Sequence, residues 1–200
     1  IVPDIGAGYS SGIVSISGCF GSVSHEFAQD IIMSNRSTMR CLEEHGQKLD
    51  MGVVIGFSYN DIQELLGSSF SPDELVIGSG NSKFHVMISG RAEAVERALE
   101  LCQNEGALKA FSFGTGVAYH HPIMKEYSKE YVDFCGSTLY APPEYPIISV
   151  FDHRVMTSGE DILRENQLNV YTPIRWDVTL DKLADMGVKE FFDTSANGAV

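Results

Sequence analysis

The sequence predicts an α/β protein in which a small lobe, about residues 50–115, is inserted into a larger α/β lobe. Two observations carry this prediction. Between residues 51 and 114, apolar runs and amphipathic stretches follow the order strand, helix, strand, strand, helix, strand. On either side, over 1–49 and 116–200, the pattern is mixed α/β. The βαββαβ order is that of a ferredoxin-like unit, so the insert is expected to be an antiparallel sheet under two helices.

The elements of the insert follow from local patterns. Four apolar runs rich in β-branched and aromatic residues predict strands over 52–57, 75–78, 84–89 and 107–113. Apolar residues at helical spacing predict helices over 62–66 and 92–103. Asn60 or Asp61 is the expected cap of the first helix, and Gly106 ends the second.

The larger lobe is expected to carry the remaining elements. A short apolar turn leads into a helical region over 5–33, and the helical pattern continues over 34–46. Further helices are predicted by the spacing of apolar residues, and they span 122–134, 160–166 and 176–186. The apolar runs at 145–150 and 188–192 predict strands.

Composition excludes several classes of function. The formal net charge is −13, from 27 acidic and 14 basic residues, which argues against binding to nucleic acid or to anionic lipid. No apolar run approaches the ~20 residues of a membrane span, and nothing in the sequence argues for secretion. The four cysteines form no CxxC pair and have no histidine at metal-ligand spacing, so we expect reduced thiols, no metal and a cytoplasmic location.

A G-x-S-x-G motif occurs near the start of the chain, as Gly8-Tyr9-Ser10-Ser11-Gly12. In a nucleophile elbow, small neighbours let the serine occupy a tight turn between a strand and a helix. Apolar Ile5 precedes the motif and a helical stretch follows it, so Ser10 is a candidate nucleophile. The Ser11 N–H would then help to stabilise an oxyanion at the helix N-terminus. A plain glycine-rich turn is the alternative.

A nucleophilic serine needs a base, and the chain has six histidines. His120 and His121 differ from the others in context, because they lie between an apolar strand with a glycine-containing turn and a helix that begins with Pro122. Loops at strand ends often hold catalytic groups. A surface position is the alternative for either histidine.

Four segments resemble, in order, the motifs of the malonyl-CoA:acyl carrier protein transacylase family, which includes the acyltransferase domains of fatty-acid and polyketide synthases. Pro3–Gly12 resembles P-D-x-x-x-G-H-S-x-G, and Asn81–Gly90 resembles N-S-P-x-Q-V-V-I-S-G. Ala118–Met124 resembles A-F-H-S-P-L-M, and Pro173–Trp176 resembles P-V-R-W. The resemblance implies an α/β-hydrolase-like lobe, residues 1–49 and 116–200, with a ferredoxin-like lobe, residues 50–115, between serine and histidine.

The resemblance also implies roles for single residues. Ser10 matches the nucleophile and His120 the base, whereas His121 falls where the family has a small residue. Arg36 matches the arginine that grips the free carboxylate of a malonyl group, with Arg40 as the rival. Four more residues fall at expected substrate-binding positions, namely Tyr9, Ser11, Asn81 and Tyr119. The ring of Tyr119, just before the base, is expected to favour malonyl over methylmalonyl.

The chain departs from the family pattern at several positions. Tyr9 occupies the position where the family has a histidine, Ile13 that of a glutamate and His85 that of a glutamine. The opening G-Q-G-S-Q segment, which supplies half of the family's oxyanion hole, has no match. The resemblance therefore implies an N-terminally truncated lobe whose activity on its own is open.

The implied function is transfer of a malonyl group from CoA to the phosphopantetheine thiol of an acyl carrier protein, through an acyl-serine intermediate. No bound cofactor or metal is expected, and the expected partners are the acyl-CoA, the carrier protein and other domains of a synthase. Two alternatives stay open: an acyl-thioester hydrolase on the same scaffold, and a non-catalytic acyltransferase-like scaffold module. A lipase-type hydrolase is disfavoured because it lacks a ferredoxin-like insert at this place.

Overall fold

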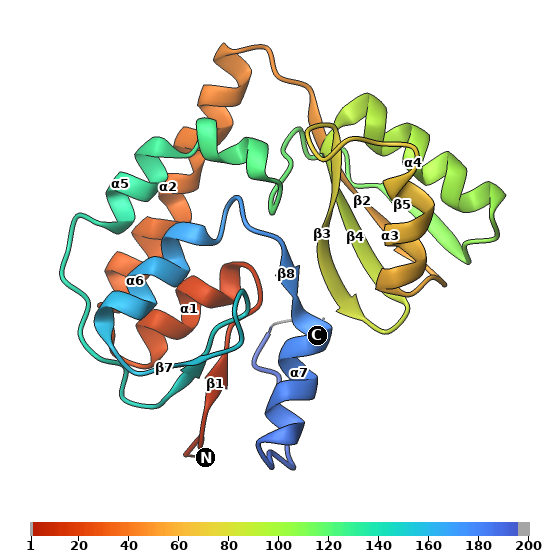
Figure 1. Cartoon of the computed structure of the whole chain (residues 1–200). Helices are drawn as coiled ribbons and strands as arrows, with labels where there is room; N and C mark the ends of the chain where they lie inside the picture. Colours follow the sequence, from red (N-terminus) through yellow and green to blue (C-terminus); the bar gives the residue numbers. More distant parts are fainter. Residues whose placement is uncertain (1, 196–200) are drawn as a thin grey trace.

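The computed structural model describes residues 2–195 and shows two bodies side by side (Figure 1). Helices dominate one body, and they are α1 (Ser11–Cys19), α2 (His25–Glu44), α5 (Lys129–Cys135) and α6 (Gly159–Leu168). The other body is a sheet with α3 (Tyr59–Gly67) and α4 (Ala92–Asn104) on one face (Figure 1). The predicted division into an α/β lobe and an inserted lobe is therefore visible in the fold.

The larger sheet has the strand order β5-β2-β4-β3-β8. Its four antiparallel strands are β2 (Leu49–Ile55), β3 (Leu75–Ser82), β4 (His85–Arg91) and β5 (Lys109–Ser112). Their apolar faces pack against α3 and α4 through buried residues that include Val54, Ile62, Val86, Val95 and Leu99. This confirms the predicted antiparallel sheet under two helices.

A fifth strand joins this sheet from the C-terminal part of the chain. Strand β8 (Ile174–Arg175) pairs in parallel with β3, with Ser79 opposite Ile174. Helix α7 (Trp176–Asp185) follows β8 directly and packs near β3. The C-terminal segment therefore ties the inserted sheet to the helical body, which the local sequence pattern does not predict.

A small three-stranded sheet lies within the helical body. Strand β1 (Gly6–Ala7) pairs in parallel with β6 (Ile147–Ile148), and β6 pairs antiparallel with β7 (Val155–Met156). Helix α1 begins four residues after β1 ends, so the Gly8–Ser10 loop is a tight strand-to-helix connection. The described part of the chain contains no helix that is both long and apolar enough to cross a membrane.

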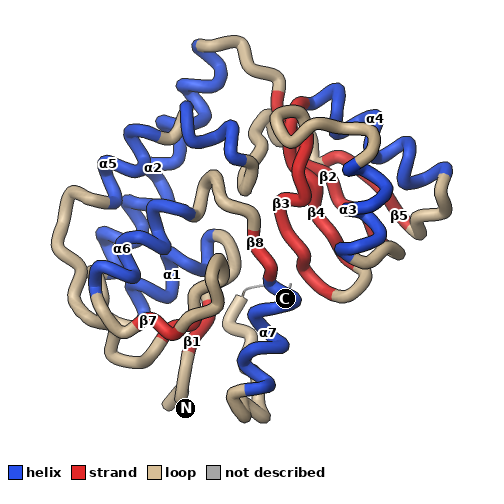
Figure 2. The backbone as a smooth tube through the Cα atoms, in the orientation of Figure 1, coloured by secondary structure: helices blue, strands red, loops and turns tan. Residues whose placement is uncertain are grey.

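Figure 2 shows where helices and strands lie, and four predicted elements differ in the structure. The helical region expected over 5–33 is interrupted between Cys19, where α1 ends, and His25, where α2 begins. The helix expected over 122–134 is broken into a 3-10 helix η1 (Pro122–Glu126) and α5. The strand expected over 145–150 is reduced to β6. The strand expected over 188–192 is wrong, because this segment has no regular structure and Phe191 and Phe192 are exposed.

The cap of α3 also differs from the prediction. Ser58 is the N-cap, and its side chain accepts a hydrogen bond from the Asp61 N–H. The Asp61 carboxylate in turn accepts a hydrogen bond from the Ser58 N–H, so the two residues form a capping box. Asp61 is thus the third helical residue rather than the cap.

Gly90, in the motif 81–90, is a position where the backbone of a neighbour leaves no room for a side chain. A Cβ atom at Gly90 would overlap the carbonyl oxygen of Glu74, which lies on the strand-β3 side of β4. We predict that Gly90→Ala lowers the free energy of unfolding by about 1–3 kcal/mol, since backbone atoms cannot rotate away. Urea denaturation measures this change.

Gly67→Ala is the matched control, because a Cβ atom at this helical position has no atom within 4 Å. Alanine is favoured over glycine in a helix, so this variant should be neutral or slightly stabilised. Equal losses of stability in the two variants would contradict the packing argument.

Candidate active site

Ser10 lies in a strained turn between β1 and α1. Its backbone has φ 51° and ψ −116°, a left-handed conformation that a non-glycine residue rarely adopts. The turn requires glycine at position 8, where a Cβ atom would overlap the carbonyl oxygen of Gly12. A Cβ atom at Gly12 would have no described atom within 4 Å, so only the first glycine of the motif is explained by close packing. This geometry is that of a nucleophile elbow.

His120 faces Ser10. The Ser10 Oγ lies 3.1 Å from the Nε2 of His120, within hydrogen-bond distance. The other ring nitrogen, Nδ1, lies 3.2 Å from the carbonyl oxygen of Thr172, which can only accept, so we assign the proton to Nδ1. The Nε2 atom is then free to accept the proton of the Ser10 hydroxyl. The sequence prediction that these two side chains meet is fulfilled in the structure.

The position of His120 is held by its backbone as well as by its ring. Its φ of 64° is also left-handed, and its N–H donates to the carbonyl oxygen of Val170 at 2.8 Å. The side chain is buried, and burial lowers its pKa from the ordinary 6.5 to about 4. The imidazole is therefore neutral at physiological pH, as a proton acceptor needs to be.

The backbone after Ser10 offers a donor for an oxyanion. The Gly12 N–H donates a hydrogen bond to the carbonyl oxygen of Tyr9, and the Ile13 N–H donates one to the carbonyl oxygen of Ser10. Among residues 2–195, no acceptor pairs with the Ser11 N–H, which is the first N–H of α1. A free N–H at a helix N-terminus beside a serine oxygen suits a developing negative charge.

A pocket of about 120 Å³ opens next to the serine and histidine. It is lined by residues from the elbow, α1, α2, α5, the 119–120 loop and the 169–170 loop, namely Ser10, Ser11, Val14, Ile32, Asn35, Tyr119, His120, Tyr131, Asn169 and Val170. These lining residues, all in the described part of the chain, include no lysine or arginine. The structure thus brings together four of the predicted site residues: Ser10, Ser11, Tyr119 and His120.

Arg36 is not brought into this pocket. It is exposed on α2, and the residues of α2 that line the pocket are Ile32 and Asn35. The rival Arg40 is exposed too and pairs with Glu130 of α5 at 3.2 Å. The sequence resemblance therefore pointed to α2, which does line the pocket, but Arg36 is not among its lining residues.

Tyr9 and Asn81 form a link between the two bodies rather than a wall of the pocket. The Tyr9 hydroxyl donates to Asn81 Oδ1 at 2.8 Å and lies 3.2 Å from Ser79 Oγ, so it joins the elbow to β3. Its ring packs on Trp176, with centroids 5.5 Å apart. Burial raises the pKa of Tyr9, which keeps the hydroxyl protonated as a donor. Both residues therefore hold the elbow in place.

His121 has a structural role. Its Nδ1 accepts a hydrogen bond from the Ile123 N–H at 3.0 Å and so caps the 3-10 helix η1. Burial, aided by Arg91, lowers its pKa to about 4, so it stays a neutral acceptor at physiological pH. This cap also explains why η1 begins abruptly at Pro122.

Sequence reasoning missed two residues at the site. Asn35 immediately precedes the arginine chosen from the same motif, and both residues lie at helical spacing from Ile32, so no sequence signal separates them. Thr172 acts only through its backbone carbonyl, and its place just before Pro173–Trp176 was the available hint. Among residues 2–195, no group of three or more metal-binding side chains is found.

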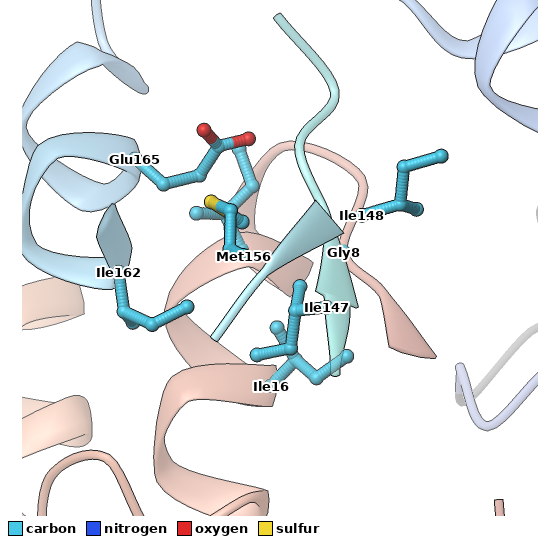
Figure 3. Close-up of a pocket in the computed structure, with 8 residues that line it drawn as sticks. Gly8, Ile16, Ile147, Ile148, Met156, Ile162 and Glu165 are labelled. Carbon is cyan, nitrogen blue, oxygen red and sulfur yellow. The ribbon is translucent and has the colours of Figure 1, made fainter. Parts of the chain in front are cut away.

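A second, very small cavity of about 10 Å³ lies beneath the elbow, and Figure 3 shows Gly8 and Glu165 on its walls. The buried Glu165 carboxylate accepts hydrogen bonds from Ser149 Oγ and from the Val150 N–H, each at 2.8 Å. Burial raises its pKa from the ordinary 4.5 to about 7. Glu165 thus joins α6 to the segment just after β6. Because β6 pairs with β1, this link also supports β1.

The fold and this site define a class of protein: an α/β-hydrolase-like fold with an inserted ferredoxin-like lobe and a serine–histidine pair at the junction. No family model matches the chain. In sequence it is 27% identical over 197 residues to the malonyl CoA-acyl carrier protein transacylase of Bacillus subtilis and 26% identical over 186 residues to that of Haemophilus influenzae. These matches cover 96% and 93% of the chain but only 61% and 59% of the relatives, so the chain spans about three fifths of their length.

Solved structures give the same result. A malonyl-transacylase in complex with its type II polyketide synthase acyl-carrier protein superposes with a TM-score of 0.84 at 25% identity, covering 94% of this chain and 60% of that one. An acyl carrier protein S-malonyltransferase from Vibrio cholerae superposes equally well, with a TM-score of 0.84, 25% identity and coverage of 94% and 61%. The resemblance to the malonyl-CoA:acyl carrier protein transacylase family is confirmed in sequence and in fold.

The buried Glu165 makes the stability of the protein depend on pH. Its pKa in the folded protein lies above that of an exposed glutamate, so its contribution is full below about pH 4.5 and is lost as the pH rises through about 7. We predict that the free energy of unfolding falls, relative to Glu165→Gln, by about 3 kcal/mol between pH 4.5 and pH 8. Denaturant unfolding at several pH values measures the difference.

Glu64→Gln on the exposed face of α3 serves as the control. Its stability should follow that of the unmodified protein at every pH. Parallel curves for the unmodified protein and Glu165→Gln would show that Glu165 titrates like an exposed group.

Proposed function

We propose that the site transfers an acyl group from a CoA thioester to the phosphopantetheine thiol of an acyl carrier protein, through an ester on Ser10. The observation that carries this proposal is the 3.1 Å contact between Ser10 Oγ and a buried His120, whose Nδ1 faces the Thr172 carbonyl. The proposed acyl group is malonyl, because relatives with this named activity match 93–96% of the chain.

The first half-reaction forms the acyl-serine. His120 Nε2 takes the proton of the Ser10 hydroxyl while Oγ attacks the thioester carbonyl, and the Ser11 N–H stabilises the resulting oxyanion. The C–S bond then breaks, and the departing CoA sulfur receives the proton from His120.

The second half-reaction regenerates the serine. The carrier thiol gives its proton to His120 and its sulfur attacks the ester carbonyl. The C–O bond breaks, and Ser10 recovers the proton from His120. The proposed reaction uses no metal or redox cofactor, because no electrons are transferred and the charge that develops on oxygen is met by the Ser11 N–H.

Two further features fit this proposal. The Tyr119 ring lines the pocket, and it would occupy the space that a 2-methyl branch needs, which favours malonyl over methylmalonyl. All four cysteines are free thiols, as expected in the reducing cytoplasm, where we place the reaction.

Intact-mass measurement after incubation with malonyl-CoA tests the proposal. We predict a gain of one malonyl group on the full chain, located on Ser10 by peptide mapping and absent in Ser10→Ala. His120→Ala should slow acylation by about 10²–10⁴-fold, because the general base is lost. His25→Ala, which removes an exposed histidine of α2, is the matched control and should not change the rate.

A hydrolase is the second candidate, since no arginine lines the pocket to hold a carboxylate against the serine. Release of free malonate without a carrier thiol, at a rate that pantetheine does not increase, would favour hydrolysis. Failure of every acyl-CoA tested to modify Ser10 would contradict both reactions and favour a scaffold role.

A further inference from the structure

Among the described residues of helix α2, Asn35 is the polar one that lines the pocket beside Ser10 and His120, and its side chain is an amide. Ile32 and Asn35 lie one turn apart on the face of α2 that lines the pocket. Arg36 is exposed and outside the lining. At about 100° per residue, adjacent positions on a helix point in clearly different directions, so Asn35 and Arg36 cannot occupy the same place.

Asn35 is held against the residue that precedes the proposed base. Its Nδ2 donates to the Tyr119 hydroxyl at 3.0 Å, and that hydroxyl lies 3.9 Å from the sulfur of Met39, one turn further along α2. Tyr119 is fixed at its backbone as well, because its carbonyl oxygen accepts from Ser89 Oγ at 2.7 Å. These contacts fix where the Asn35 side chain lies against Tyr119.

The hydrogen-bonding capacity of Asn35 is only partly used. Its Oδ1 is buried and has no partner among the described residues. A buried amide oxygen without a partner is unfavourable, so the amide gains from any group that completes its bonding. Half a turn of the amide group exchanges its oxygen and nitrogen, so that Oδ1 accepts from the Tyr119 hydroxyl and Nδ2 takes the unpaired position in the wall of the pocket.

We infer that Asn35, and not Arg36, contacts the distal end of the acyl group, and that the site takes a short acyl group with a polar end through a hydrogen bond from a neutral amide rather than through an ion pair. This inference rests on the proposed acyl-serine chemistry. It makes Asn35 a specificity-determining residue for an oxygen at the far end of the acyl group, as in malonyl. Removal of one hydrogen bond to a charged group corresponds to a loss of about 10-fold to 100-fold in affinity.

Binding to the Ser10→Ala chain separates this inference from turnover. Titration calorimetry measures the Kd of malonyl-CoA and of acetyl-CoA for the Ser10→Ala chain. The same measurement is made on Ser10→Ala chains that also carry Asn35→Ala, Asn35→Asp or Arg36→Ala. Asn35→Ala should weaken malonyl-CoA about 10-fold or more and acetyl-CoA less than about 3-fold. Arg36→Ala should leave both affinities within about 2-fold.

Asn35→Asp is the isosteric variant, and it keeps the shape of the pocket while placing a carboxylate beside the malonyl carboxylate. Like charges at close range repel, so malonyl-CoA should bind more weakly to it than to Asn35→Ala, with acetyl-CoA little changed. Circular dichroism of each variant checks that the fold is kept.

The outcomes distinguish the two proposals. Loss of malonyl-CoA binding in Arg36→Ala but not in Asn35→Ala, or no binding of either CoA ester, would overturn the inference. Dependence on Asn35 in binding, without any acylation of Ser10 in the unmodified chain, would leave the inference standing and contradict the acyl-serine chemistry.

Discussion

The contact between Ser10 Oγ and His120 Nε2 is the interaction on which the rest of the site depends. Both residues have left-handed backbone conformations, with φ 51° and φ 64°, and such conformations persist only where the surroundings fix them. For Ser10 the surroundings are β1, the start of α1 and the close approach of Gly8 to Gly12. For His120 they are two backbone carbonyls, those of Val170 and Thr172. The elements around the pocket therefore hold Ser10 and His120 in unfavourable backbone conformations that place their side chains in contact.

The segment after Thr172 connects this contact to the inserted lobe. Thr172 orients His120, and two residues later β8 pairs with β3. Tyr9, the neighbour of Ser10, bonds to Asn81 of the same strand and packs on Trp176. The nucleophile and the base are thus anchored to one strand of the inserted sheet from two directions. The ferredoxin-like lobe positions both catalytic candidates, although neither lies within it.

The sequence predicts the inserted lobe and the serine–histidine pair well, because both rest on strong local signals. Strand and helix periods alternate clearly over 51–114, and the motifs around Ser10 and His120 lie close to the residues themselves. Three features escaped prediction for physical reasons. Strand β8 has two residues and forms only by pairing with distant β3. The 188–192 run has a strand-like pattern, but β5 and β8 form the edges of the larger sheet and the run pairs with neither. Asn35 was missed because an error of one residue on a helix turns a side chain by about 100°.

The central claim is that His120 is a buried neutral imidazole with its proton on Nδ1 and its Nε2 directed at Ser10. Nitrogen-15 NMR of the labelled protein, followed from about pH 3 to pH 8, reports both the tautomer and the pKa of this ring. The structure predicts the Nδ1–H tautomer and a pKa of about 4, well below that of a free histidine. A proton on Nε2, or titration near the ordinary 6.5, would contradict the account.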